Sequence, residues 1–136
     1  MAYEVQIGGT ATDRVFLDTD LTRVFEVLDI DTDPLGLTAK NVSGWALTFD
    51  IRVSDKSVAA LKSFAIASGL AIAGTFNSVA ASNAQRVTWT CADTDLTTAI
   101  FGAGGGTFRY SLKRTDAGSE AILQYGNIVI QRATQV

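Results

Sequence analysis

The sequence contains no histidine and only one cysteine among its 136 residues. Without histidine, the chain cannot form His-dependent nucleophilic triads or the His-containing zinc sites of many enzymes. The single cysteine, Cys91, cannot form an internal disulfide, and it alternates in phase with the apolar residues Val87 and Trp89. We therefore expect Cys91 to be a buried apolar side chain, and the sequence predicts no enzyme activity, no metal site and no cofactor.

Carboxylates are the groups that remain for catalysis or metal binding. Most of them lie in predicted turns, where aspartate is favoured because it hydrogen-bonds the local backbone. The turn at residues 29–36 carries three alternate aspartates, as a calcium loop does at its start. However, it has Pro34 and Lys40 where a calcium loop has glycine and a bidentate glutamate. We interpret it as an acidic turn, with calcium binding as the alternative.

Charged residues are scarce, at 18% of the chain, against about 25% in ordinary globular proteins. The 11 basic and 14 acidic residues give a net charge of −3, and the longest basic cluster is the pair Lys113 and Arg114. The sequence therefore predicts no nucleic-acid partner. A surface poor in charge is typical of a subunit that other proteins cover, although a β domain with a neutral polar surface has the same composition.

Long hydrophobic runs are missing as well. The longest uncharged apolar stretch, residues 63–76, is rich in alanine, serine and glycine, and it is shorter than the roughly 20 residues that a membrane span needs. The N-terminal residues lack the basic and apolar regions of a secretory signal. We therefore expect a soluble protein without a membrane partner.

The sequence is instead rich in alternating apolar and polar residues. In the clearest case, Trp45, Leu47, Phe49, Ile51 and Val53 alternate with small or polar residues. This period of two predicts a strand with one buried apolar face and a charged row in water. The same alternation in later strands completes the predicted core with Val87, Trp89, Phe108, Tyr110 and Leu112.

The other segments extend the β pattern. Residues 58–76 fit either a short helix or two short strands of a hairpin, and we favour the hairpin. A short helix is predicted near residues 94–101, followed by a glycine run at 102–106 that lacks the lysine of a phosphate-binding loop. Residues 107–131 predict a long hairpin with a bulge at Gly126, where the apolar, inward phase changes from Leu123 and Tyr125 to Ile128 and Ile130.

These elements predict an all-β protein. About eight short strands, with turn signals every 8 to 12 residues, are typical of an immunoglobulin-like antiparallel β-sandwich. No repeat or low-complexity linker divides the chain. We therefore expect a single β-sandwich domain over residues 10–136, preceded by an N-terminal arm at residues 1–9.

The N-terminal arm is itself predicted to be a strand. Tyr3, Val5 and Ile7 alternate with small or polar residues, and a pair of glycines ends the segment. Such alternation needs a surface to cover, so the arm either completes its own domain or adds to the sheet edge of a neighbouring subunit. We slightly favour the second use, which makes Tyr3, Val5 and Ile7 candidate inter-subunit contacts.

Four stretches, taken in order, resemble a domain of tailed-phage virion proteins. They are residues 20–27, residues 42–52, residues 92–96, and the hairpin strands at 106–112 and 126–130. Their order is similar to that of the N-terminal domain of baseplate upper proteins and related tail-fibre and head-fibre modules. The chain departs from this pattern at Val42 and Ser43, where the family has leucine and threonine, and no fibre region follows Val136.

This resemblance implies a non-enzymatic virion subunit that acts through protein–protein contacts. It would be a tail, baseplate or fibre adaptor or a capsid decoration protein, made in the host bacterial cytoplasm, with other virion proteins and copies of itself as partners. The alternative is a carbohydrate- or receptor-binding β-sandwich module, but the aromatic residues that a sugar site would expose fall on inward phases. A bacterial adhesin module is a third hypothesis, and it needs an export signal.

Overall fold

Nine strands, one α-helix and one short 3-10 helix form the protein in a computed structural model, which describes residues 4–8, 14–29, 33–54 and 59–131. For residues 4–8 and 14 it describes the backbone alone. The strands are β1 (Glu4–Gly8), β2 (Arg14–Phe16), β3 (Leu21–Leu28), β4 (Leu47–Arg52), β5 (Lys62–Ile66), β6 (Gly69–Ala73), β7 (Arg86–Cys91), β8 (Gly106–Arg114) and β9 (Ala121–Gln131). The helices are η1 (Ala80–Ser82) and α1 (Thr98–Phe101).

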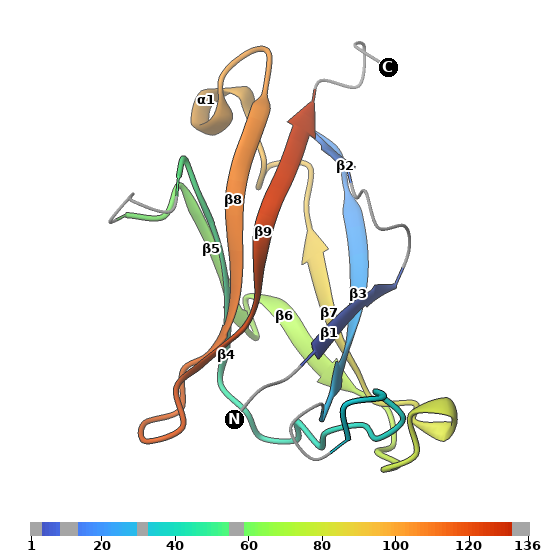
Figure 1. Ribbon diagram of the computed structural model, residues 1–136. Coiled ribbons are helices and arrows are strands. Elements are labelled where there is room, and N and C mark those ends of the chain that lie inside the picture. The colour runs from blue at the N-terminus through green and yellow to red at the C-terminus, as the bar shows by residue number, and fades with distance from the viewer. Residues whose placement is uncertain (1–3, 9–13, 30–32, 55–58, 132–136) are drawn as a thin grey trace.

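All nine strands join one hydrogen-bonded sheet, in the order β1-β3-β7-β6-β5-β4-β8-β9-β2. The sheet curls until it is nearly barrel-shaped, so that an arm containing β5, β4, β8 and β9 faces an arm containing β6, β7, β3 and β1 (Figure 1). The protein is therefore all-β, as the sequence predicts. The immunoglobulin-like antiparallel sandwich is not confirmed, because the strands belong to a single sheet and two pairings, β5 with β6 and β9 with β2, are parallel.

The two arms are joined at the corner between β5 and β6. The sequence predicts a hairpin here, and that pairing is wrong: Ala65 lies opposite Gly69 and Ile66 opposite Leu70 in a parallel register. β5 pairs with β4 and β6 with β7, so the chain crosses from one arm to the other at this point. Gly69 has a φ of +97°, and a Cβ there would lie 2.4 Å from Cδ1 of Phe64.

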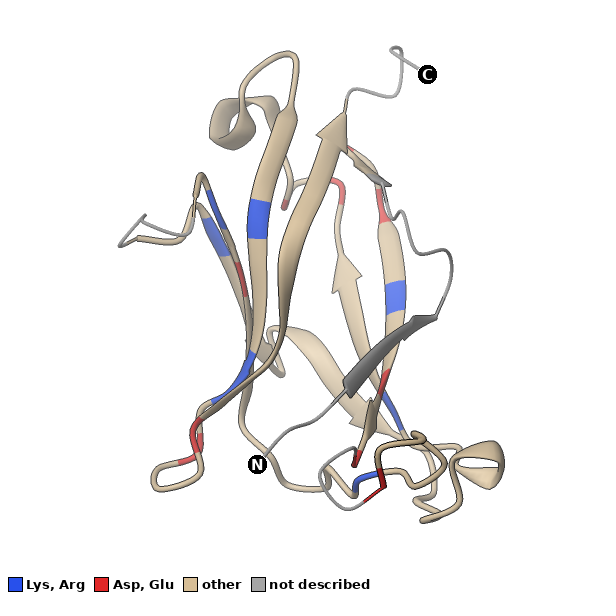
Figure 2. Cartoon of the chain, in the orientation of Figure 1, with Lys and Arg blue, Asp and Glu red and all other residues tan. Residues whose placement is uncertain are grey.

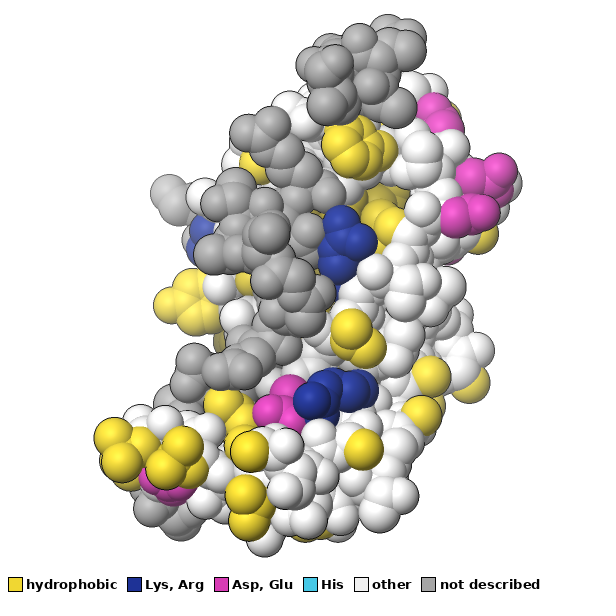
Figure 3. Space-filling view, turned by 90° about the vertical axis from the view of Figure 1, so that its right-hand side faces the viewer, with side chains coloured by type: hydrophobic (Ala, Val, Ile, Leu, Met, Phe, Trp, Pro, Cys, Tyr) yellow, Lys and Arg dark blue, Asp and Glu magenta, His cyan; other side chains and the backbone are white. Residues whose placement is uncertain are grey.

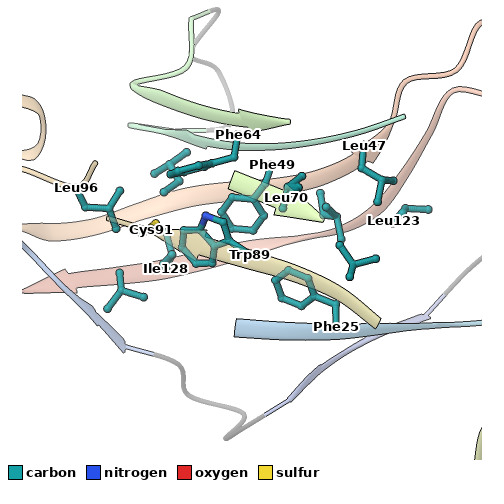
Figure 4. Close-up of a cluster of buried hydrophobic side chains, with 14 of the residues drawn as sticks. Phe25, Leu47, Phe49, Phe64, Leu70, Trp89, Cys91, Leu96, Leu123 and Ile128 are labelled. Carbon is teal, nitrogen blue, oxygen red and sulfur yellow. The ribbon is translucent and has the colours of Figure 1, made fainter. Parts of the chain in front are cut away.

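The core between the arms is built on stacked aromatic rings (Figure 4). Phe49 of β4 stacks on Trp89 of β7 with ring centroids 4.4 Å apart, and it also stacks on Phe25 of β3 at 6.2 Å. Phe64 of β5 meets Trp89 edge-on at 5.5 Å. Because these rings come from both arms, their contacts hold the curled sheet closed around its core.

The structure buries most of the residues predicted for the core. Trp45, Leu47, Phe49, Ile51, Val87, Trp89 and Leu112 are buried, whereas Phe108 and Tyr110 are partly buried against them. Two predictions for the central strand are wrong. Val53 lies beyond the end of β4 and is 59% exposed, and Asp50, expected in water, is only 4% exposed.

The final hairpin forms as predicted, with β8 antiparallel to β9. The predicted bulge at Gly126 is wrong: the register shifts between Leu112 and Lys113, which leaves Leu123 as the extra residue of β9. Gly126 lies opposite Tyr110, and a Cβ at Gly126 would be 3.4 Å from that ring. The predicted short helix is also present, as the single turn of α1.

The arm predicted at the N-terminus forms β1, which pairs antiparallel with β3 of the same chain, from Glu4 opposite Leu28 to Gly8 opposite Val24. Of the candidate inter-subunit residues, Tyr3 lies outside the described residues. Val5 and Ile7 lie on β1, where only the backbone is described. A role of this arm in a neighbouring subunit stays a prediction.

Candidate functional site

The candidate site is a surface of exposed apolar side chains. Among the residues that the structure describes, no group of three or more His, Cys, Asp or Glu side chains is placed to hold a metal ion. Over the same ranges, no helix is long and apolar enough to cross a membrane. The largest exposed apolar groups among the described residues lie on two loops and on β9.

Three exposed apolar residues, Leu35, Leu37 and Val79, form what we call the loop patch. Their exposed fractions are 80%, 64% and 54%. The two loops that carry them are joined by a bridge between Thr38 and Val79, and the Ala80 N–H donates to the Leu37 carbonyl at 2.9 Å. Charged side chains are few on the face in Figure 3, and hydrophobic side chains gather at its lower end.

Asp33 fixes the shape of the first loop. One of its carboxylate oxygens accepts hydrogen bonds from the Leu37 N–H at 3.1 Å and the Thr38 hydroxyl at 2.9 Å, and the other accepts from the Leu35 N–H at 3.3 Å. This is the local backbone role expected of aspartate in a turn. The Asp33 carboxylate, one of the three that a calcium loop would use here, is thus already bonded to the loop itself, whereas Asp31 lies outside the described residues.

A buried polar network anchors the second loop. The Glu26 carboxylate accepts from the Arg86 guanidinium at 2.7 Å and from the Asn83 side-chain amide at 3.1 Å. Gln85, also buried, accepts from the Val42 N–H at 3.0 Å and so ties the two loop regions together. Satisfied buried networks of this kind rigidify their surroundings, so the loop patch is presented in a fixed shape.

A second exposed apolar group lies on the outer face of β9. Tyr125, which the sequence places on an inward phase, is 68% exposed. The Arg109 guanidinium lies 5.8 Å from the centroid of its ring and donates to the Asn127 side-chain oxygen at 2.8 Å. An aromatic ring is therefore available for stacking on this face, next to a positioned guanidinium and amide.

Charged side chains are spread over strands and loops rather than gathered at one site (Figure 2). The most buried of them, Asp50, accepts from the Ser63 hydroxyl at 2.7 Å and lies 3.2 Å from nitrogen atoms of Arg52 and Lys113. Burial acts to raise the pKa of Asp50, but these three partners together hold it below its ordinary value. Asp50 is therefore a paired structural charge.

Cys91 is buried, as the sequence predicts. Burial, together with the nearby Asp95 carboxylate, raises the pKa of its thiol to about 12. A thiol with such a pKa is almost entirely protonated at neutral pH and is a poor nucleophile. Cys91 therefore contributes packing to the core.

Sequence reasoning missed the loop patch. The available signal was weak: Leu35 and Leu37 are large apolar residues in a turn next to the only proline, where no strand phase would bury them. The sequence also does not predict the exposure of Tyr125. The apolar phase of β9 changes at a bulge, and the position of that bulge cannot be seen in the sequence.

Neither a protein-family model nor a curated protein matches the chain.

Proposed function

We propose that the protein is a non-enzymatic structural subunit of a tailed-phage virion, which acts through protein–protein contacts. The observation that carries the protein-contact role is the loop patch of Leu35, Leu37 and Val79, which keeps three large apolar side chains in water. The virion setting rests on the resemblance of the sequence to tailed-phage virion domains. That setting means a place in tail, baseplate, fibre or capsid, with other virion proteins as partners.

The fixed shape of the loop patch supports this proposal. Association is opposed by the ordering of loops and side chains, so a surface that is already ordered binds at a lower cost in free energy. Asp33 and the bridge at Val79 supply that order before any partner arrives. A patch of three side chains is smaller than a stable interface, which buries about 800 Å² per partner, so neighbouring surfaces would contribute as well.

The test is a double substitution, Leu35→Ser with Leu37→Ser, compared with Val53→Ser as a control at an exposed apolar site that is not part of the loop patch. We expect the double variant to fold normally but to lose self-association in sedimentation and incorporation into phage particles. The control should keep both. A double variant that associates and incorporates like the wild type would contradict the proposal.

A carbohydrate- or receptor-binding module is the second candidate, and the exposed ring of Tyr125 favours it. Sugars stack on aromatic rings and accept hydrogen bonds from arginine and amide groups, and Arg109 and Asn127 lie beside this ring. A glycan array would test this candidate. Specific binding by the wild type that Tyr125→Ala abolishes would rank it above the virion proposal.

The immunoglobulin-like relationship also belongs to the proposal. It is supported by the two facing arms of the sheet, whose aromatic side chains meet in one core. In this view, the short parallel pairing of β5 with β6 is a local join between two otherwise separate layers. An experimental structure in which the strands close into a continuous barrel would contradict it.

A further inference from the structure

The sheet is incomplete between β5 and β7. Lys62, Ser63 and Phe64 pair with β4 on one side, whereas the pairing of β5 with β6 covers only Ala65 and Ile66. On the far side of the gap, β7 pairs with β3 as far as Cys91, but its pairing with β6 ends at Trp89. Past Gly69, where β6 begins, the edge of β5 at residues 62–64 therefore faces the edge of β7 at residues 90–91. No described strand lies between these two edges.

A cleft of about 370 Å³ lies at this gap. Ser63 and Phe64 of β5 line one side of it, and Thr90 and Ala92 line the other. Gly69, where β6 begins, is also part of its wall. The cleft thus occupies the position that a continued β6 would fill, and its volume falls in the range of about 300–1,000 Å³ that is common for binding pockets.

The backbone of Ser63 is directed into this cleft. Successive residues of a strand point their N–H and C=O groups toward opposite edges, so residues two apart point the same way. The Ala65 N–H points toward β6, because it donates to the Ser68 carbonyl at 3.0 Å. Ser63, two residues earlier, therefore presents its N–H and C=O at the same edge, where β6 is no longer beside β5.

We propose that the cleft binds an extended segment of another polypeptide, which adds as a strand beside β5. A strand placed here would pair with the Ser63 backbone and continue the sheet, which is how exposed sheet edges capture peptides. Phe64 lines the cleft and its ring lies against Gly69, so we expect the inward side chain of the segment to be small. Lys62 and Asp95 also line the cleft and form a partly exposed ion pair at 3.3 Å, which suits polar outward side chains.

This inference does not depend on the virion proposal, because it rests on strand register and on the cleft alone. The full chain would be used to select binders from a displayed library of short random peptides. Selected peptides would then be measured against two pairs of variants. Ser63→Pro removes the N–H, whereas Ser63→Ala keeps it and loses only the hydroxyl. Ala92→Trp fills the cleft, whereas Ala103→Trp changes an exposed loop elsewhere.

We expect selected peptides whose binding weakens at least about tenfold with Ser63→Pro and with Ala92→Trp, and changes little with Ser63→Ala and Ala103→Trp. Hydrogen exchange at the Ser63 amide should slow when the peptide binds. A selected sequence that matches part of this chain would identify a second copy as the source of the strand. If no peptide is enriched, or if Ala92→Trp binds the selected peptides as well as the wild type does, the proposal is wrong. Ala92→Trp keeps that test valid if Ser63→Pro does not fold.

Discussion

Asp50 illustrates how a single polar residue can be built into the wall of an apolar sheet. It lies on the outer face of β4, yet Ser63 of β5 and Lys113 of β8 reach over it from the neighbouring strands. A buried carboxylate is costly unless it is paired and hydrogen-bonded, and here both conditions are met. The residue therefore links three adjacent strands.

We predict that Asp50→Asn lowers the free energy of unfolding by about 1–3 kcal/mol at neutral pH, since it leaves charged partners without their acceptor. The folded pKa of Asp50 lies below its ordinary value of 3.8, so its ionic stabilisation is complete above the unfolded pKa and is lost as pH falls through the folded pKa. Urea denaturation at a series of pH values measures this. The difference between wild type and variant should shrink below about pH 4, and a difference independent of pH would contradict the assignment.

Trp89 is the largest fully buried side chain, and it contacts both Phe49 and Phe64. We predict that Trp89→Ala costs about 3–5 kcal/mol, a large share of the roughly 5–15 kcal/mol that stabilises a typical domain. Trp89→Phe is the matched control: it keeps a ring in the stack and should cost less than half as much. Chemical denaturation gives both values, and an unchanged midpoint for Trp89→Ala would mean that the core is placed wrongly.

The corner between β5 and β6 depends on the backbone at Gly69. We predict that Gly69→Ala destabilises the fold by about 2 kcal/mol or more, because φ is +97° and the new Cβ would overlap the buried ring of Phe64. Gly104→Ala is the control, since a Cβ there meets nothing within 4 Å. Thermal or urea denaturation compares the two variants. Equal stabilities would show that the corner tolerates a side chain.

The strands themselves could be predicted well from the sequence. Alternation identified β4, β7, β8 and β9, because one face of each is buried and a period of two is hard to mistake over six or more residues. Pairing was harder. β5 and β6 were recognised as strands but not as a parallel corner, because their register depends on contacts with β4 and β7 that no local pattern encodes.

Errors in predicted burial have the same origin. Val53 continues the apolar phase of β4 but falls after the strand ends, so nothing covers it. The apolar phase of β9 changes at the extra residue Leu123. The sequence pattern places this change at Gly126 and therefore predicts a buried Tyr125, which is exposed in the structure. Val53 and Tyr125 are exposed because of where a strand ends or bulges, and tertiary packing decides those positions.

Considered as a whole, the molecule presents its candidate binding surfaces at separate places. The loop patch lies at one end, the ring of Tyr125 lies on the outer face of β9, and the cleft lies between β5 and β7. Several separate surfaces suit the proposed role, because a subunit of a ring, shell or filament contacts more than one neighbour.

The N-terminal arm provides the test of whether β1 serves this chain or a neighbour. β1 lies at the edge of the described sheet, where it pairs with β3. We therefore predict that a chain lacking residues 1–9 still folds, with a lower denaturation midpoint, because the pairing of β3 with β7 is left in place. Circular dichroism and urea denaturation measure this part.

Assembly is then compared between the truncated and full chains, by sedimentation and by incorporation into phage particles. A strand that pairs at a sheet edge and is followed by a pair of glycines is well placed to exchange between copies, so we expect the truncated chain to fold but to fail in assembly. Normal assembly of the truncated chain would contradict the inter-subunit role of the arm. Collapse of the fold would instead assign the arm to its own sheet, where Glu4 to Gly8 pair with β3.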